Sequence, residues 1–333
     1  MRLDPNRAGG GSALLGFLLL LTGCSVERLP GSPAVEDHPK LLMAFLSERP
    51  PSTPFTDDIY FYDVSTDGPP YLPANLNTPS GEGPCALSGN GRRLAFFSSR
   101  LPTGSTSLMF LYDIATGQTT IPQKINQLFY VQNPTLSYDG RFLAAQYQVS
   151  GPFDLFIAIQ DLVADSLLQV PNLNAVNATN FDPSLSRDGS LMAFASNRVG
   201  TLGAFDIFLY SVPGDSVIPV PGLNSSAQEL SASISADGRY IAFQSGRLGG
   251  VGLIDVYLYD RQTQSLLPLP GANTNLSEIQ PTISPDGRYL AFASESTGGR
   301  DVKLYDIRDR RLLPLEGIND PFFFDSFPSL ADR

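Results

Sequence analysis

Residues 283–292 of the chain read ISPDGRYLAF, and residues 234–243 read ISADGRYIAF. The glycine of this motif recurs with a constant spacing of 49 residues. It stands at Gly91, Gly140, Gly189, Gly238 and Gly287. A fixed period in this range is typical of solenoids, propellers and other repeat arrays. The sequence therefore predicts a ring or stack of equivalent units.

Each period contains four segments with strand character. A short strand leads into an Asp-Gly or Asn-Gly turn, a strong hairpin signal because the turn needs positive φ. A second strand with alternating side chains follows, then a variable loop and a third strand. The third strands begin at Ile59, Met109, Leu155, Ile207, Val256 and Val302. A fourth, proline-bearing strand is expected at the outer edge of each sheet, where proline is best tolerated.

Four antiparallel strands in 40 to 50 residues describe one blade of a β-propeller. The six third strands predict six blades. The first period begins at its second strand, in residues 41–45, whereas residues 328–331 match the opening strand of the other periods, as at 281–284. We therefore predict an all-β, six-bladed propeller of four-stranded blades. Its C-terminal strand should join the N-terminal blade and close the ring, leaving no open sheet edge.

Composition supports an all-β fold and argues against nucleic-acid binding. Hydrophobic residues make up 42% of the chain, with 30 Gly and 28 Pro, and no long segment shows helical periodicity. The formal net charge is −11, and Lys40, Lys124 and Lys303 are the three lysines among 22 basic residues. A basic surface for phosphate backbones is therefore not expected.

The N-terminus has the features of an export signal. Arg2 and Arg7 precede the nine-residue run ALLGFLLLL at 13–21, which is too short to span a bilayer. The following LTGC, ending at Cys24, resembles a bacterial lipobox. That resemblance implies a lipoprotein signal peptide over residues 1–23 and a lipid on Cys24. An ordinary secretory signal followed by an incidental cysteine is the alternative.

The residues after Cys24 bear on anchoring and domain organisation. Ser25, in place of Asp, implies outer-membrane sorting if the host is Gram-negative, with the protein facing the periplasm. Residues 24–39 are rich in Pro, Gly, Ser and charge and are expected to form a flexible tether. The propeller should occupy residues 40–333, and Cys85 would be its single cysteine.

The repeat resembles that of TolB-type propellers. The resemblance rests on ISPDGR at 283–288, LAF at 290–292 and the third-strand pattern at 301–306, and it extends over residues 40–333. It implies the propeller fold but not one particular activity. TolB carries an α/β domain before its propeller, whereas a short tether precedes the first blade here. We therefore do not expect the role of TolB in the Tol–Pal envelope system.

A residue present in every blade is most simply scaffold, so function is sought where the repeat is broken. The residues just before the inner strands differ between blades and should crowd the channel mouth. They are Glu82, Asn133, Asp182, Glu229 and Gln280. The last crossover carries Phe322, Phe323 and Phe324, which either plug the closing blade or form an exposed patch for a partner.

Repeated charges near the loops also have two interpretations. Arginines follow the second strand at Arg49, Arg100, Arg198 and Arg247. Aspartates open the third strand at Asp58, Asp154, Asp206, Asp255 and Asp301. In blades one, four and five, which have both, a hairpin ion pair is expected. A ring of arginines that binds phosphate or carboxylate groups is the alternative.

The sequence offers little for catalysis. The one histidine, His38, lies in the tether, which removes a Ser-His-Asp triad and a His-rich metal centre from the propeller, and no G-x-S-x-G motif occurs. Asp182 with Glu229 or Glu82 could form the carboxylate pair of a carbohydrate-active enzyme. The leading hypothesis is a non-catalytic, lipid-anchored envelope scaffold, without metal or cofactor, that binds a protein or peptide through its loop face.

Overall fold

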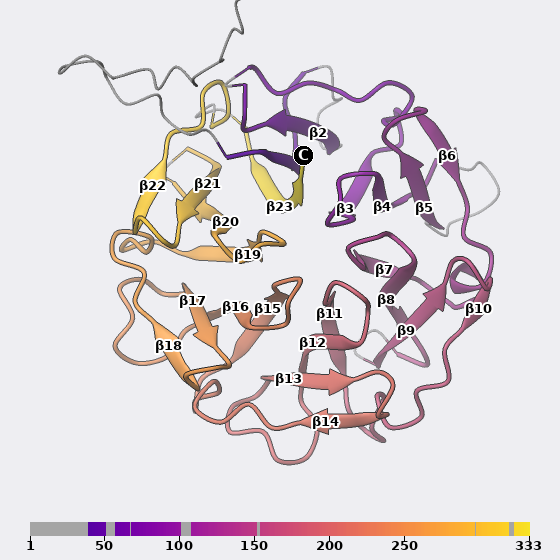
Figure 1. Cartoon of the computed structure of the whole chain (residues 1–333), viewed down its shortest axis with the longest axis vertical. Coiled ribbons are helices and arrows are strands. Elements are labelled where there is room, and N and C mark those ends of the chain that lie inside the picture. Colours follow the sequence, from indigo (N-terminus) through magenta and orange to yellow (C-terminus); the bar gives the residue numbers. More distant parts are fainter. Residues whose placement is uncertain are drawn as a thin grey trace, which may run out of the picture. The chain divides into compact units, whose positions relative to one another are not determined.

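The computed structural model describes residues 39–50, 57–66, 68–100, 108–151, 154–296, 298–319 and 323–333. In these ranges the chain forms strands and one short 3-10 helix, η1 (Ile125–Gln127). Six sheets surround a central axis as the blades of a propeller (Figure 1). The predicted all-β, six-bladed fold is confirmed. No helix among the described residues is long and apolar enough to cross a membrane.

The blades follow one another along the chain. Blade 1 consists of β23 (Asp325–Asp332), β1 (Leu41–Ser47) and β2 (Asp58–Asp63). Blade 2 consists of β3 (Glu82–Leu87), β4 (Arg93–Ser98), β5 (Leu108–Asp113) and β6 (Gln118–Thr120). Blade 3 consists of β7 (Gln132–Leu136), β8 (Phe142–Gln148), β9 (Leu155–Asp161) and β10 (Ser166–Leu167).

The other three blades repeat this order from the channel outward. Blade 4 consists of β11 (Asn180–Leu185), β12 (Leu191–Ser196), β13 (Asp206–Ser211) and β14 (Ser216–Ile218). Blade 5 consists of β15 (Glu229–Ile234), β16 (Tyr240–Ser245), β17 (Asp255–Asp260) and β18 (Ser265–Leu267). Blade 6 consists of β19 (Glu278–Ile283), β20 (Tyr289–Glu295), β21 (Arg300–Asp306) and β22 (Arg311–Leu313).

The outer strands are short because proline limits them. β14 ends at Ile218, directly before Pro219, which has no N–H to continue the ladder. Blade 1 departs furthest from the repeat. It is a three-stranded sheet, and a single bridge between Phe61 and Tyr71 stands where an outer strand would lie.

The Asp-Gly turns are closed by their own side chains, as blade 5 shows. The Ser235 hydroxyl donates to Asp237 Oδ1 at 2.5 Å and accepts the Tyr240 N–H at 2.9 Å. Asp237 Oδ1 also accepts the Arg239 N–H at 2.9 Å. Gly238 has φ of 73°, a conformation that glycine adopts without strain. These contacts give the aspartate a turn-forming role.

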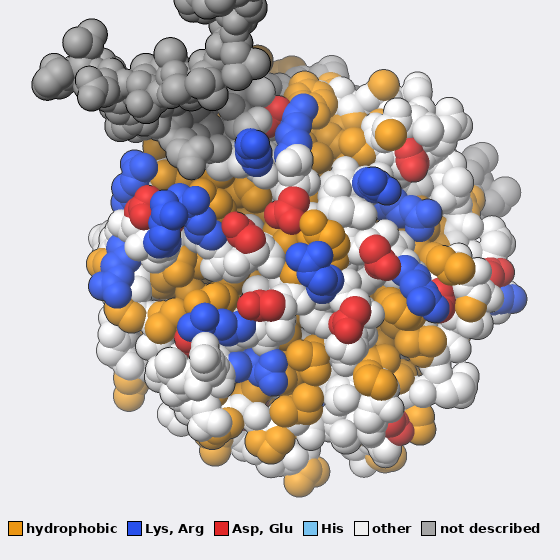
Figure 2. Space-filling view, in the orientation of Figure 1, with side chains coloured by type: hydrophobic (Ala, Val, Ile, Leu, Met, Phe, Trp, Pro, Cys, Tyr) orange, Lys and Arg blue, Asp and Glu red, His pale blue; other side chains and the backbone are white. Residues whose placement is uncertain are grey.

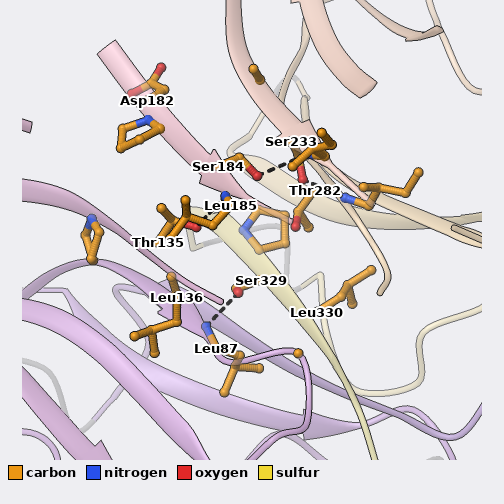
Figure 3. A pocket seen from close by; sticks show the side chains of 18 of the residues that line it. Leu87, Thr135, Leu136, Asp182, Ser184, Leu185, Ser233, Thr282, Ser329 and Leu330 are labelled. Atoms are coloured by element: carbon orange, nitrogen blue, oxygen red, sulfur yellow. Dashed lines mark hydrogen bonds between the residues drawn. The ribbon is translucent and has the colours of Figure 1, made fainter. Parts of the chain in front are cut away.

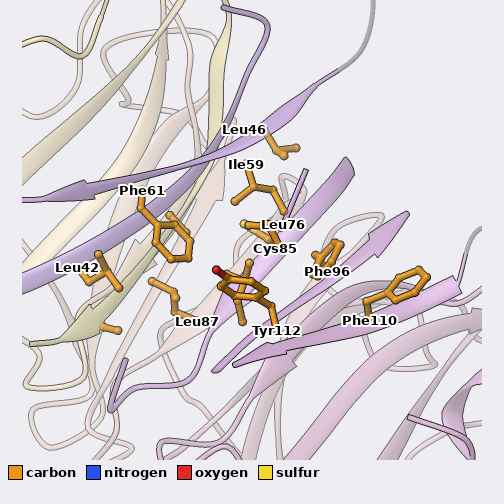
Figure 4. Close-up of a cluster of buried hydrophobic side chains, with 13 residues drawn as sticks. Leu42, Leu46, Ile59, Phe61, Leu76, Cys85, Leu87, Phe96, Phe110 and Tyr112 are labelled. Carbon is orange, nitrogen blue, oxygen red and sulfur yellow. The ribbon is translucent and has the colours of Figure 1, made fainter. Parts of the chain in front are cut away.

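The hydrophobic core lies between neighbouring blades. Figure 4 shows the cluster between blades 1 and 2, where Leu42 and Phe61 face Leu87, Phe96 and Tyr112. The phenylalanine of the second strand is fully buried wherever it occurs. It occurs at Phe45, Phe96, Phe194, Phe243 and Phe292. Burying each ring contributes about 1.5–3 kcal/mol, so the repeat encodes the contact between blades.

The two ends of the chain close the ring. β23 pairs antiparallel with β1, with Leu41 opposite Asp332 and Met43 opposite Leu330. The Arg333 N–H donates to the Lys40 carbonyl at 3.1 Å, so the two termini of the propeller lie side by side on the face of the Asp-Gly turns. The predicted closure by the C-terminal strand is confirmed.

Backbone hydrogen bonds between successive Asp-Gly turns strengthen this closure. The Arg187 N–H donates to the Ala236 carbonyl at 2.8 Å, and the Ala236 N–H donates to the Pro285 carbonyl at 3.0 Å. Pro285 has no N–H to extend this series into blade 1. Between blades 1 and 2 the series continues, because the Asp332 N–H of β23 donates to the Gly89 carbonyl at 2.8 Å.

Candidate functional site

The six inner strands enclose a cavity of about 200 Å³ on the propeller axis. Its wall carries a ring of hydroxyl groups, each of which accepts a backbone N–H from the inner strand of the next blade (Figure 3). The acceptors are Thr135, Ser184, Ser233 and Ser329, with N···O distances of 2.9–3.3 Å. These hydroxyls are engaged in holding neighbouring blades together.

A second ring of side chains lines the cavity nearer the loop face. Every inner strand has a register shift against its second strand, which marks a β-bulge. In five blades the bulged residue has φ near +50°. These residues are Asn133, Asp182, Ser231, Gln280 and Phe327, and all of them line the cavity. Pro84 holds the corresponding place in blade 2. The bulges turn these side chains toward the channel.

Asp182 is hydrogen-bonded to both of its neighbours in this ring. Its Oδ1 accepts a hydrogen bond from Asn133 Nδ2 at 2.8 Å, and its Oδ2 accepts one from the Ser231 hydroxyl at 3.2 Å. The Asp182 N–H donates to Gln146 Oε1 at 3.1 Å, which fixes the bulge. The Asp182 carboxylate of blade 4 is thus oriented by residues from blades 3 and 5.

The Asp182 carboxylate has only neutral partners. Burial raises its pKa above the ordinary 3.8, and the hydrogen bonds from Asn133 and Ser231 offset only part of that effect. Among the residues that line the cavity, Arg187 is the one basic side chain. It lies beyond the end of β11 and stacks on the ring of Tyr138 at 3.8 Å. A carboxylate left uncompensated inside a cavity is a candidate for binding a cationic group.

The structure places three of the five predicted mouth residues in the channel. Asn133, Asp182 and Gln280 line the cavity, as expected. The expectation is wrong for Glu82 and Glu229, which open β3 and β15 with fully buried side chains. Both lie two residues before the bulged residue, and the extra residue of the bulge breaks the alternation of the strand, so the glutamate points into the blade and away from the channel.

Glu82 and Glu229 form ion pairs with the repeated arginines. Arg100 Nη2 lies 2.9 Å from Glu82 Oε1, and Arg247 Nη2 lies 3.0 Å from Glu229 Oε1. The hairpin pairs expected in blades 4 and 5 do not form, because Asp206 and Asp255 accept loop N–H groups instead. The structure therefore does not bring Glu82 or Glu229 together with Asp182 as a carboxylate pair in the channel.

Phe323 and Phe324 are not among the residues that line the cavity. Phe323 is half-buried and Phe324 is exposed, with a backbone bridge from Phe324 to Arg300. Phe322 and Cys24 fall outside the described residues. Cys85 is buried in the core between blades 1 and 2, and burial raises its pKa to about 12, which suppresses thiolate chemistry.

Two channel residues, Ser231 and Phe327, were not predicted. Ser231 lies 49 residues after Asp182 and 49 before Gln280, so the repeat itself could have found it. Phe327 accompanies a final period that is two residues shorter, and its N–H donates to Gln280 Oε1 at 3.0 Å. Within the described residues, no group of three or more His, Cys, Asp or Glu side chains could hold a metal ion.

The end of the channel at the Asp-Gly turns is surrounded by acidic side chains. Exposed aspartates occupy the turns of four blades, at Asp139, Asp188, Asp237 and Asp286. Figure 2 shows acidic side chains around a basic one at the centre of the ring. Each of these four aspartates accepts a backbone N–H of its own turn, so this acidity accompanies turn formation.

Comparisons with known proteins agree on the fold. The model of the TolB beta propeller domain matches residues 83–325. The crystal structure of TolB from Acinetobacter baumannii is similar, with a TM-score of 0.66 and 19% identity, over 88% of this chain and 67% of that one. Putative TolB from Agrobacterium tumefaciens gives 0.58 and 14%, over 87% and 98% of the two chains.

The same fold occurs in proteins of other kinds. Kuenenia stuttgartiensis hydrazine synthase is similar with a TM-score of 0.61 and 14% identity, over 88% of this chain and 47% of that one. No curated protein matches the chain in sequence. At these identities the structural likeness shows the fold and carries no activity with it.

Proposed function

The chain belongs to the TolB beta propeller domain family, and from that premise we propose that it is a non-catalytic scaffold of the cell envelope. Its partner is a protein or peptide that binds at the loop-face mouth of the channel. A lipid on Cys24, followed by the tether over residues 24–39, anchors it to the membrane. The nine-residue apolar run at 13–21 and the LTGC sequence support export and anchoring.

The observation that carries the proposal is the uncompensated Asp182 carboxylate. Its hydrogen-bond donors, from Asn133 and Ser231, are neutral, and no cation of the described chain reaches it. A lysine side chain or an amino terminus of a partner segment would supply the missing charge, and a charge-assisted hydrogen bond is roughly twice as strong as a neutral one. The 200 Å³ cavity admits a side chain or a chain end and no folded domain.

Affinity capture from envelope extract tests this assignment. We expect the wild-type protein to retain a partner that Asp182→Asn loses, because the amide keeps the shape of the carboxylate without its charge. Asp188→Asn is the matched control, since it makes the same change in an exposed turn at the other end of the channel. Equal recovery of all partners by Asp182→Asn and the wild type would contradict the proposal.

The anchor is tested separately by fractionation. Cys24→Ser removes the acceptor for the lipid and is expected to move the protein from the membrane fraction to the soluble fraction. Ser25→Asp is the companion variant, and in a Gram-negative host it should move the protein between membranes without releasing it. Retention of Cys24→Ser in the membrane fraction would contradict anchoring through Cys24.

A further inference from the structure

Two neighbouring blades carry loops of the same unusual composition. RVGTLGAFD at residues 198–206 joins β12 to β13, and RLGGVGLID at residues 247–255 joins β16 to β17. The pattern is an arginine, then apolar residues separated by glycines, then an aspartate. Between the arginine and the aspartate neither loop has a charged residue. Both loops lie on the face opposite the Asp-Gly turns.

The bulky side chains of these loops are displayed to solvent. The exposed fractions are 102% for Val199, 68% for Leu202, 99% for Leu248, 65% for Val251 and 81% for Leu253. We call these five side chains the apolar tips. Isolated exposed apolar residues are ordinary on a protein surface, but a concentration of five on the equivalent loops of two neighbouring blades is typical of an interaction site.

The loops are held in shape by the aspartates at their ends. Asp206 accepts the N–H groups of Leu202 and Gly203 at 2.8 and 3.0 Å. Asp255 likewise accepts those of Val251 at 2.5 Å and Gly252 at 2.9 Å. Backbone groups that are paired inside the protein can leave water at little cost, which is a requirement for entry into an apolar medium.

The arginines of the loops are withdrawn from the surface. Arg198 donates to the Leu173 carbonyl at 2.6 Å and is 8% exposed, and Arg247 pairs with Glu229 inside blade 5. Blade 6 differs at the same place. Its β20–β21 hairpin ends in Glu295 and Arg300, whose side chains are partly or largely exposed. The exposed side chains of the blade 4 and blade 5 loops are thus apolar, whereas the blade 6 hairpin next to them carries charged side chains.

We propose that the apolar tips insert into the surface of a lipid bilayer. They protrude from the ring, as insertion requires, and a zwitterionic surface fits their lack of charge. The net charge of −11 opposes close approach to an anionic surface, so the contact is hydrophobic rather than electrostatic. Contact through blades 4 and 5 alone tilts the ring and leaves the channel mouth open beside the charged blade 6.

Tryptophan reporters in the full chain test this contact without interference from the N-terminus. The protein contains no tryptophan, so Leu202→Trp and Leu248→Trp each place a single reporter at one tip. Val163→Trp is the control, because Val163 is 77% exposed in the β9–β10 turn on the opposite face. Each variant is mixed with phosphatidylcholine vesicles whose acyl chains are brominated, and its circular dichroism melt confirms folding.

The expected result is a shift of emission to shorter wavelength and quenching by bromine at both tips, with neither change at Val163→Trp. Unquenched tips on a chain that floats with the vesicles would show attachment through the N-terminus alone and overturn the proposal. Tips that respond to an envelope protein fraction but not to vesicles would assign the patch to a protein and also overturn it. Adding Asp182→Asn should leave the tip signals unchanged, which separates this inference from the partner site.

Discussion

Glu229 and Asp182 stand at the loop-face ends of neighbouring inner strands, and their carboxylates are treated in opposite ways. Glu229 is fully buried and receives Arg247 at 3.0 Å and the Ser245 hydroxyl at 2.8 Å. Asp182 faces the channel and receives only the neutral donors of Asn133 and Ser231. The charge of Glu229 is compensated within its own blade. Asp182, whose position carries an acid in one blade only, has no such partner and is available to a charged group of another molecule.

Blade 3 lacks the acid, the serine and the arginine together. The places held in blade 5 by Glu229, Ser245 and Arg247 are held in blade 3 by Val131, Tyr147 and Val149, each 98 residues earlier. Val131 is buried, and the ring of Tyr147 meets that of Phe156 at 6.1 Å. Blade 4 instead keeps the serine and the arginine but has Asn180 in place of the acid, and Arg198 Nη2 donates to Asn180 Oδ1 at 3.2 Å. Blade 6 keeps Glu278 and Ser294 but has Ser296 in place of the arginine.

The largest effect on stability is predicted for Glu229→Gln. It leaves the guanidinium of Arg247, 12% exposed, without its counter-charge, and breaking a buried pair from one side costs about 3–5 kcal/mol. Urea unfolding monitored by circular dichroism should give a free energy of unfolding lower by that amount. A loss below about 1 kcal/mol, the worth of a surface pair, would show that the pair is not part of the scaffold.

Removing both charges should restore most of that loss. In Glu229→Gln/Arg247→Met the thioether retains contact with the rings of Phe243 and Tyr257, which now flank the guanidinium at 4.9 and 4.7 Å. We expect the double variant to be more stable than Glu229→Gln by about 1–4 kcal/mol. Additive losses in the two single variants and the double variant would contradict the coupling of Glu229 with Arg247.

The hydroxyl ring of the channel should contribute less per residue. Ser233→Ala removes the acceptor of the Ile283 N–H at 3.0 Å and is expected to cost about 1 kcal/mol of unfolding free energy. Blade 2 provides the matched reference, because it has Ala86 at this position and Ala86→Ser restores a hydroxyl. No change in Ser233→Ala would mean that these hydroxyls are not scaffold.

Asp182 should destabilise the free protein as pH rises. Its pKa is raised in the folded state, so the folded protein holds its proton more tightly than the unfolded chain. The contribution to stability is therefore present at low pH and is lost as pH rises from near 3.8 through the folded pKa. Urea unfolding from pH 3.5 to 7 should show a smaller loss of stability in Asp182→Asn than in the wild type, because Asp325 and Asp332 also have raised pKa values and remain. Asp188→Asn should keep the loss that Asp182 causes.

The sequence was sufficient for the fold and insufficient for the site. The constant spacing of glycines such as Gly238 and Gly287 predicted the repeat, because each turn needs a residue that tolerates positive φ, and the six third strands predicted the number of blades. The channel residues were predicted only in part. Glu229 and Asp182 lie near the starts of equivalent inner strands, two positions apart in the repeat. Which of these two positions faces the channel is decided by the bulge. The bulge depends on pairing with the second strand, as at 180–185 against 191–196.

The proposed partner site at the channel mouth depends most on whether the Asp182 carboxylate lacks a charged partner inside the protein. A titration of its side-chain carbonyl carbon by NMR, assigned by comparison with Asp182→Asn, measures this directly. We expect a pKa above 3.8 in the free protein, because burial disfavours the charged form. A pKa at or below that value would show that the chain already neutralises this charge, and the assignment of the channel mouth as a site for a cationic partner group would then be wrong.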